Sequence, residues 1–380
     1  MNWKIPLFKM YWDTQDISAV TKVIKRGSYW TMGPEIQTLE EHIADFIGSR
    51  YGISFNSGTS ALHATLLAYD IKHGDEVIVP SFTFIATANV VVLTGAKPVF
   101  ADIERQSYAL DPEVVKEKIT SKTKAIVPVH YGGGPCKNIN ALKEIAEDYH
   151  LVLLEDAAES LGAKIHNKRV GSFGDAAMFS FCQNKVITAG EGGMVVTDSK
   201  HIAEKLQLIR SHGRVESNEG YFATTQELDY IRAGYNYRLP SINAALILSQ
   251  FKKFNKIIRM RREKASYYTK KISKIETIRT PAESKGEHHV YQLYTIELPT
   301  KKARDQMQRN LTKERIMTKV YFEPIHLKTF YVKEFNYKKN DLPVTEEMAE
   351  KVLTLPLYPS LTKKEMDYVI SAIKKGCNKV

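Results

Sequence analysis

The chain has little cysteine and no long apolar run. Three widely spaced cysteines, Cys136, Cys182 and Cys377, occur in 380 residues. Their number and spacing predict neither a disulfide framework nor a metal site, and they suit a reducing compartment. No stretch reaches the roughly 20 apolar residues of a membrane-spanning helix, and the first residues lack the apolar core of a signal peptide. We therefore expect a cytoplasmic protein that binds no metal and no membrane.

Negative charge is in deficit, and the formal net charge is +11. The densest basic stretch runs from Lys252 to Lys264. Apolar residues recur around it at helical spacing (Ile247, Phe251, Phe254 and Ile258), which predicts a packed helix with its lysines and arginines on the outer face. No zinc finger, recognition helix or RNA-binding aromatic pattern accompanies the charge. We expect no nucleic-acid partner. A nucleic-acid-binding regulator remains the alternative, and a steep salt dependence of DNA binding would identify it.

Strand-like runs alternate with helical ones along the first 200 residues. Such alternation predicts an α/β fold with a parallel sheet and crossover helices. The expected strands are Tyr51–Phe55, Glu76–Pro80, Lys97–Ala101, Ala125–Val129, Val152–Asp156, Ala176–Ser180 and Gly193–Thr197.

The alternation stops near Pro240, where we place a domain boundary. Residues 1–240 are predicted to form a large domain, and residues 241–380 a long helix and a small C-terminal domain. The long helix is expected from Ser241 to Lys271, and a strand from Tyr291 to Leu298. Near the end, Thr362 and Glu365 form a capping-box pattern before an amphipathic helix.

Lys185 is the strongest candidate for a reactive side chain. A partly buried lysine amine can form a Schiff base with an aldehyde cofactor. Ser180 offers a hydroxyl nearby, and Gly190, Gly192 and Gly193 let the backbone turn tightly beside a bulky ligand. The alternative is an ordinary solvated lysine.

Asp156 lies 29 residues before Lys185, at the end of an apolar run. Pyridoxal phosphate (PLP) needs a lysine for its aldehyde, a carboxylate for its ring nitrogen, a phosphate cradle and a flat support for its ring. Ligands gather at the carboxyl ends of parallel strands, so Asp156 suits the ring nitrogen. A helix N-cap is the alternative role.

A phosphate cradle is expected where a short strand gives way to a helical run. Ser57, Gly58 and Thr59 would lie in the first turn of that helix, where free N–H groups and the helix dipole attract anions. The alternative is an ordinary turn and cap. Phe84, at a second strand-to-helix transition, could support the cofactor ring or could be a core residue.

Together these segments resemble the DegT/DnrJ/EryC1/StrS sugar aminotransferases over nearly the whole chain. The run 181–194 is most similar to GDP-perosamine synthases. The segments that carry the resemblance are Asn-Ser-Gly-Thr-Ser-Ala-Leu (56–62), Pro-Ser-Phe-Thr-Phe (80–84), Glu-Asp-Ala-Ala-Glu-Ser-Leu-Gly-Ala (155–163), Gly-Ser-Phe-Gly-Asp (171–175), Arg-Ser-His-Gly-Arg (210–214), Gly-Tyr-Asn-Tyr-Arg (234–238), Pro-Ile-His (324–326) and Leu-Pro-Leu-Tyr-Pro (355–359).

The resemblance implies PLP fold type I, which is aspartate-aminotransferase-like. A large domain with a mostly parallel seven-stranded sheet would be followed by a smaller α+β domain. It also implies a homodimer in which Asn236 reaches the cofactor phosphate of the neighbouring subunit. Asn236 and Arg238 could instead fix a loop.

The resemblance also assigns cofactor roles. Lys185 would bind PLP and then act as base and acid, and Asp156 would pair with the ring nitrogen. Gly58, Thr59 and Ser180 would bind the phosphate, although Ser180 could be a turn hydroxyl. Phe84 and Ala158 would flank the ring. Glu159, where many members carry Gln, would lie by the ring hydroxyl.

The implied reaction moves an amino group from glutamate or glutamine to C4 of a nucleotide-linked 4-keto-6-deoxy sugar. Trp30 and His326 could line the substrate groove or could be packed residues, and loops 214–233 and 320–332 would carry the sugar and nucleotide pockets. A 3-keto-sugar aminotransferase shares every cofactor residue. A PLP sugar dehydratase is a further rival, but those enzymes typically carry His in place of Lys185.

Overall fold

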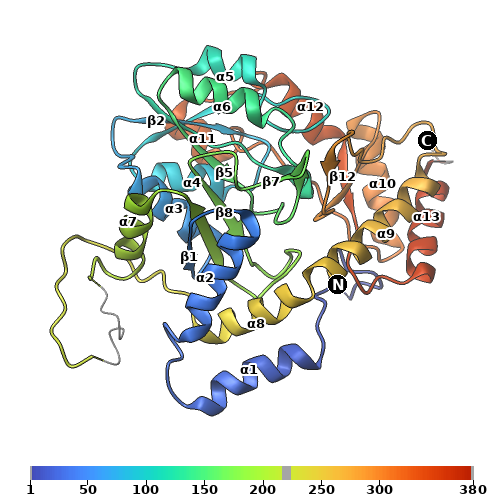
Figure 1. Cartoon of the computed structure of the whole chain (residues 1–380). Coiled ribbons are helices and arrows are strands. Elements are labelled where there is room, and N and C mark those ends of the chain that lie inside the picture. Colours follow the sequence, from blue (N-terminus) through green and yellow to red (C-terminus); the bar gives the residue numbers. More distant parts are fainter. Residues whose placement is uncertain (1, 216–223, 378–380) are drawn as a thin grey trace.

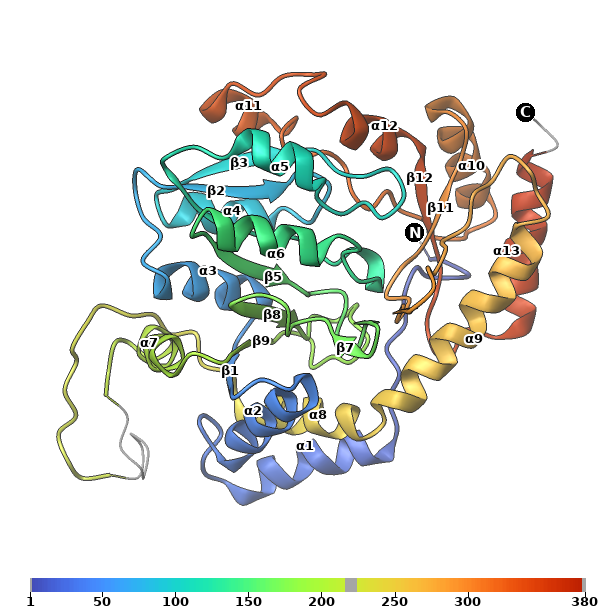
Figure 2. The same ribbon diagram turned by 45° about the horizontal axis from the view of Figure 1, so that its top comes forward.

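The computed structural model describes residues 2–215 and 224–377. Part of the expected substrate loop 214–233 therefore lies outside the described residues. The polypeptide forms a layered α/β unit with a C-terminal unit beside it, and the long helix α9 (Phe254–Ile272) runs from one to the other (Figures 1 and 2).

A seven-stranded sheet lies at the centre, in the order β1-β9-β8-β5-β4-β2-β3. Only β9 runs antiparallel to its neighbours, which confirms the mostly parallel sheet. The strands are β1 (Tyr51–Phe55), β2 (Glu76–Pro80), β3 (Lys97–Ala101), β4 (Thr123–Ile126), β5 (Val152–Asp156), β8 (Ala176–Ser180) and β9 (Gly193–Thr197).

Helices cover both faces of this sheet, as a largely parallel sheet requires. Alternation along β2 shows the division: Val77 and Val79 pack on one face, and Ile78 packs on the other. The first face is covered by α3 (Gly58–Ala68), α4 (Ala86–Leu93) and α7 (Lys200–Arg210). The second is covered by α2 (Pro34–Ile47), α5 (Pro112–Lys118), α6 (Ile139–Asp148), α8 (Ser241–Lys252) and the start of α9. Helix α1 (Thr14–Arg26) lies against α8.

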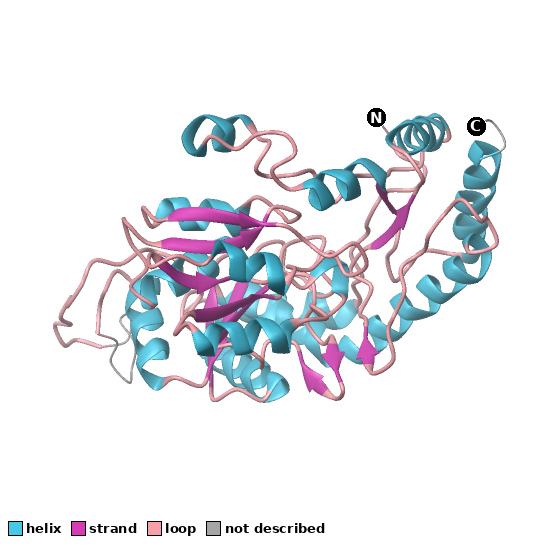
Figure 3. Cartoon of the chain, turned by 90° about the horizontal axis from the view of Figure 1, so that it is seen from above, coloured by secondary structure: helices cyan, strands magenta, loops and turns pink. Residues whose placement is uncertain are grey.

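The C-terminal unit has its own apolar core. It is built from the end of α9, a two-stranded antiparallel sheet and helices that lie beside the large sheet in Figure 3. Its elements are β11 (Tyr294–Glu297), α10 (Lys301–Lys313), β12 (Val352–Leu355) and α13 (Lys363–Cys377). Thr362 and Glu365 cap α13 reciprocally, because each backbone N–H bonds to the other's side chain.

Short elements complete the described chain. Helices α11 (Thr329–Phe335) and α12 (Pro343–Lys351) lead into β12, and a 3-10 turn (Tyr131–Gly133) follows β4. A small three-stranded sheet contains β6 (Lys164–Ile165), β7 (Lys168–Arg169) and β10 (Glu287–His288). No helix among the described residues is long and apolar enough to cross a bilayer.

The predicted long helix is wrong in one respect, because it breaks at Lys253 into α8 and α9. The prediction that its basic residues all face outward is also wrong. The Lys253 ammonium is buried and bonds Asp13 and Asp16 of α1, each at 2.7 Å. Arg261 is buried and donates to three backbone carbonyls. Both cations therefore join elements together.

The predicted boundary at residue 240 stays a prediction. Helix α8 packs against α2 and the large sheet, and Ile258 of α9 still belongs to that core. Ala265, two turns later, belongs to the C-terminal core. Among the described residues, the change of core thus takes place along α9.

Candidate active site

The candidate residues gather at one edge of the large sheet because their strands end there. Asp156 pairs with Met178 of β8, and Ser180, two residues further along β8, pairs with Gly193 of β9. Gly193 also pairs with Phe55, the last residue of β1. Residues that follow β1 and residues that end β5 and β8 are therefore brought to the same edge, where parallel-sheet proteins bind ligands.

Asp156 is buried and held in a fixed orientation. Its Oδ2 accepts a hydrogen bond of 2.8 Å from the Thr87 hydroxyl of α4, and its Oδ1 accepts one of 3.2 Å from the Ala158 amide. A turn rather than a helix follows, so the helix N-cap alternative is wrong. Burial raises the pKa of Asp156, against the lowering effect of the Thr87 bond. A buried carboxyl of this kind gains most when a cation comes to pair with it.

Lys185 follows β8 in a turn closed by its own amide, which donates to the Cys182 carbonyl at 2.9 Å. Its side chain is 14% exposed, so it is not an ordinary surface lysine. The Nζ atom lies 3.6 Å from Oε1 of Glu159, and Oε2 of Glu159 accepts the Gly132 amide at 2.8 Å. The amine is therefore partly buried beside a carboxylate.

The start of α3 forms a cradle with the end of β8. The Ser57 hydroxyl caps α3 by accepting the Ser60 amide at 3.0 Å. No acceptor for the Gly58 or Thr59 amide occurs in the described parts of the chain, so both can serve an anion. A Cβ on Gly58 would lie 3.1 Å from the Ser180 side chain, so glycine permits the close approach of helix and strand.

Phe84 lies between β2 and α4 and is 60% exposed. It is therefore not a core residue, and the nearby Phe82 packs into the core instead. Ala158 is half-buried in the turn after Asp156. Stacking of Phe84 and Ala158 on a cofactor ring stays a prediction.

Asn236 and Arg238 lie beside the cradle within the same chain. The Asn236 carbonyl accepts from the Asn56 amide group at 3.4 Å, and Arg238 donates to the Ser211 hydroxyl at 3.2 Å. The first bond ties the loop before α8 to the start of α3, and the second ties it to the end of α7. The exposed Asn236 side chain leaves its predicted role in a second subunit open.

The two substrate candidates differ. Trp30 is 49% exposed, which suits a groove residue. His326 is fully buried, and its ring nitrogens lie 2.7 Å from the Ser81 hydroxyl and 3.2 Å from Glu346. This placement favours the packed alternative for His326.

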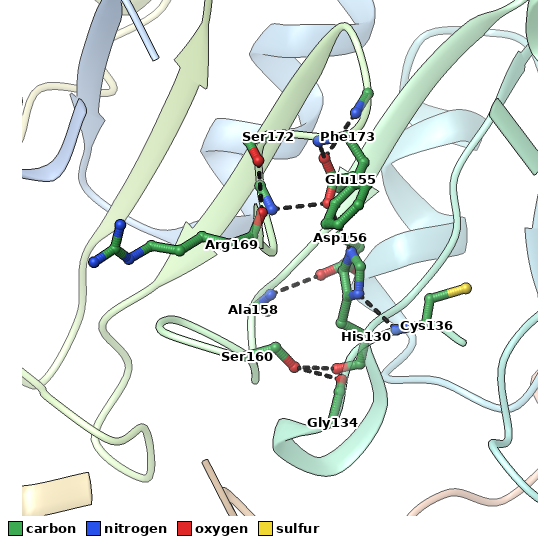
Figure 4. Close-up of polar contacts among 12 residues, drawn as sticks. His130, Gly134, Cys136, Glu155, Asp156, Ala158, Ser160, Arg169, Ser172 and Phe173 are labelled. Carbon is green, nitrogen blue, oxygen red and sulfur yellow. Dashed lines mark hydrogen bonds and ion pairs between the residues drawn. The ribbon is translucent and has the colours of Figure 1, made fainter. Parts of the chain in front are cut away.

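Sequence reasoning missed a buried network behind Asp156 (Figure 4). Glu155 Oε2 accepts from His130 Nε2 and the Gly171 amide, and Oε1 accepts from the amides of Phe173 and Gly174, all at 2.7–2.9 Å. Burial acts to raise the pKa of Glu155, but these bonds outweigh it and the pKa is lowered. A charged residue inside an apolar strand was the available signal.

His130 has one possible tautomer in this network. Its Nδ1 accepts the Cys136 amide at 2.8 Å, so the proton lies on Nε2 and is donated to Glu155. The Ser160 hydroxyl contacts the carbonyls of His130 and Gly134 (Figure 4). Loop 130–136, which carries the Gly132 amide, is thereby fastened to β5 and the turn after it.

The donor set fits PLP. A partly buried amine, a buried carboxyl at the end of β5, and a helix start with two free amides match the aldehyde, ring nitrogen and phosphate of that cofactor. The described residues contain no cluster of three or more metal-ligating side chains.

Comparisons with known proteins agree with this geometry. Residues 11–374 match the model of the DegT/DnrJ/EryC1/StrS aminotransferase family. The chain is 40% identical to the uncharacterized protein MJ1066 of Methanocaldococcus jannaschii, over 98% of this chain and 97% of that protein. It is 35% identical to the spore coat polysaccharide biosynthesis protein SpsC of Bacillus subtilis, over 95% and 94%.

A solved structure is also similar. It is Helicobacter pylori PseC, an aminotransferase involved in the biosynthesis of pseudoaminic acid, at a TM-score of 0.91 and 29% identity over 100% of this chain and 99% of that one. The chain therefore belongs to the DegT/DnrJ/EryC1/StrS family of PLP-dependent sugar aminotransferases.

Proposed function

We propose that this enzyme transfers an amino group from glutamate or glutamine to C4 of a nucleotide-linked 4-keto-6-deoxy sugar. The observation that carries the proposal is the arrangement of Lys185, 3.6 Å from Glu159, at the sheet edge where Asp156 ends β5. Two of the proteins named above act in the biosynthesis of spore coat polysaccharide and of pseudoaminic acid, and the run 181–194 is similar to GDP-perosamine synthases. A GDP-linked sugar is accordingly the first substrate to test.

Each residue has a defined task in this proposal. Lys185 would hold the cofactor aldehyde, and its released amine would take the proton from the donor's α-carbon. Asp156 pairs with the ring nitrogen, and the cradle of Gly58, Thr59 and Ser180 holds the phosphate. PLP supplies the electron sink that lets the α-carbon give up its proton. Phe84 and Ala158 would flank the ring and hold it in place.

The proposal includes a cytoplasmic homodimer with a shared site. Large apolar side chains are exposed in the segment just before Asn236: Tyr230 is 53% exposed, Ile231 59% and Tyr235 41%. Exposed apolar groups that gather in this way mark contact surfaces. A second copy covering them would bring Asn236 to the neighbouring cradle.

A product assay tests the proposal. The PLP-loaded enzyme is incubated with glutamate and a panel of GDP-, UDP- and dTDP-linked keto sugars, and the position of the new amine is read by NMR. Amination at C4 supports the proposal, whereas amination at C3 or loss of a hydroxyl would replace it with a 3-keto aminotransferase or a dehydratase. Lys185→Ala must be inactive in the same assay.

A further inference from the structure

The Gly132 amide decides which oxygen of Glu159 faces Lys185. Oε2 of Glu159 accepts that amide at 2.8 Å, so Oε1 is the atom at 3.6 Å from the lysine Nζ. Glu159 is 8% exposed, and water has little access to compete for either oxygen. Each oxygen of this carboxylate therefore has a separate partner.

The loop that carries Gly132 is fixed on several sides. The Gly132 carbonyl accepts the Leu293 amide at 2.9 Å, and the Gly133 carbonyl accepts the Val290 amide at 2.8 Å. His130, two residues earlier, is bonded to Glu155 (Figure 4). Gly132 itself has φ of +64°, a conformation that favours glycine. The amide donor thus has a set position and direction.

A fixed donor at Oε2 has a chemical consequence. A glutamine at position 159 would have to place its carbonyl oxygen on the Gly132 amide, and its NH2 group would then face Lys185. A glutamine would present a donor to the lysine, whereas Glu159 presents a charged acceptor. The two residue types therefore treat the lysine amine in opposite ways.

We propose that Glu159 is the proton partner of Lys185: in the resting ion pair Oε1 holds the amine in its ammonium form, and Oε1 takes the proton when the amine reacts and later returns it. The N–H bond of the ammonium breaks and an O–H bond forms on Oε1, which leaves a neutral amine and a neutral carboxylic acid. The proton stays in the site and no outside acid or base is needed. This inference rests on the proposed reactive role of Lys185 and deepens it.

The surroundings of Glu159 favour this exchange. Burial raises the pKa of its carboxyl, against the lowering effect of Lys185, and the nearby Asp156 raises it further. A raised carboxyl pKa reduces the free-energy difference between the ion pair and the neutral pair.

The test uses the cofactor-free chain, so it does not depend on any sugar substrate. Reductive methylation of Lys185 by formaldehyde and cyanoborohydride is followed by peptide mass spectrometry between pH 6 and pH 10. In Glu159→Gln the ammonium loses its counter-charge. We expect methylation at pH 7.5 at least about tenfold faster than in the unaltered chain, because only the neutral amine reacts and the charge that favours its ammonium form is gone. Unchanged rates would overturn the proposal.

Two further variants sharpen the result. Glu191→Gln removes an exposed carboxylate from the loop that carries Lys185, and it must leave the methylation rate within about twofold of the unaltered chain. Equal acceleration in both Gln variants would overturn the proposal. Should Glu159→Gln fail to fold, Glu159→Asp replaces it. The shorter acid keeps a charge within the roughly 4–6 Å over which an ion pair acts, so a tenfold acceleration there would overturn the proposal. Failure to aminate any keto sugar would refute the proposed function without changing these rates.

Discussion

Replacing Glu155 with glutamine is expected to destabilise the fold through two buried donors. In the native network Oε1 accepts two backbone amides, and Oε2 accepts His130 Nε2 and the Gly171 amide. A glutamine can keep one oxygen in place, but its NH2 group then faces N–H donors. His130 cannot relieve the conflict by changing tautomer, because the Cys136 amide occupies Nδ1.

The expected loss in the free energy of unfolding follows from the two N–H donors that are left without an acceptor. Each buried, unsatisfied polar group costs about 1–3 kcal/mol, so Glu155→Gln should lower the free energy of unfolding by roughly 2–6 kcal/mol. The measurement is urea unfolding of the cofactor-free protein, followed by circular dichroism at pH 7. The control is Glu350→Gln, which breaks an exposed pair with Lys301 and should cost no more than about 1 kcal/mol. A loss below 1 kcal/mol in Glu155→Gln would refute the account of this network.

The same variant has a predicted pH dependence. The pKa of Glu155 is lowered below its ordinary value of 4.5 in the folded protein. The charge-dependent part of its stabilisation is therefore complete above about pH 4.5 and is lost as the pH falls through the folded value. The stability difference between the unaltered chain and Glu155→Gln should accordingly shrink below pH 4.5 and stay constant from pH 6 to pH 8. A difference that grows on acidification would contradict the assigned charge state.

Three other substitutions test separate parts of the structure. Thr87→Val removes the hydroxyl that is bonded to Asp156. A hydrogen bond to a charged group is worth about 1.5–3 kcal/mol, so its loss should weaken PLP binding about tenfold or more in equilibrium dialysis. Unchanged affinity would refute the placement of PLP against Asp156. Gly58→Val crowds the Ser180 side chain and should lower the affinity for PLP more than that for pyridoxal, whereas equal losses would argue against a phosphate cradle. Lys253→Met leaves the buried Asp16 of α1 and the partly exposed N-cap Asp13 without their cation. The loss of the buried pair should cost about 3–5 kcal/mol in urea unfolding, and a loss under 1 kcal/mol would contradict the anchoring of α1.

Much of the sheet could be predicted from the sequence because each strand is a short apolar run between turn residues. Six of the seven expected strands have the predicted bounds. The fourth was expected over Ala125–Val129 but covers Thr123–Ile126, because Pro128 has no N–H to continue the ladder. Similarly, the strand expected over Tyr291–Leu298 is shortened to Tyr294–Glu297, where pairing with β12 ends.

The site residues that a local sequence pattern identifies could be predicted. Those that act through contacts with distant parts of the chain could not. Asp156 and Lys185 stand at strand ends that the pattern identifies. Other contributions come from hydrogen bonds to residues 25–69 positions away, made by Thr87, Gly132 and His130. No local sequence pattern predicts such partners. The buried role of Lys253 was hidden for the same reason, since its side chain bonds aspartates more than 200 residues earlier.

The central claim is that Lys185 carries PLP, and absorbance spectroscopy tests it most directly. The purified chain, loaded with PLP and freed of excess cofactor, should be yellow, and the band should bleach when glutamate is added. Borohydride reduction should fix the cofactor on the peptide that contains Lys185, and Lys185→Ala should be colourless. A loaded chain without the band, or a Lys185→Ala variant that retains it after dialysis, would contradict the account.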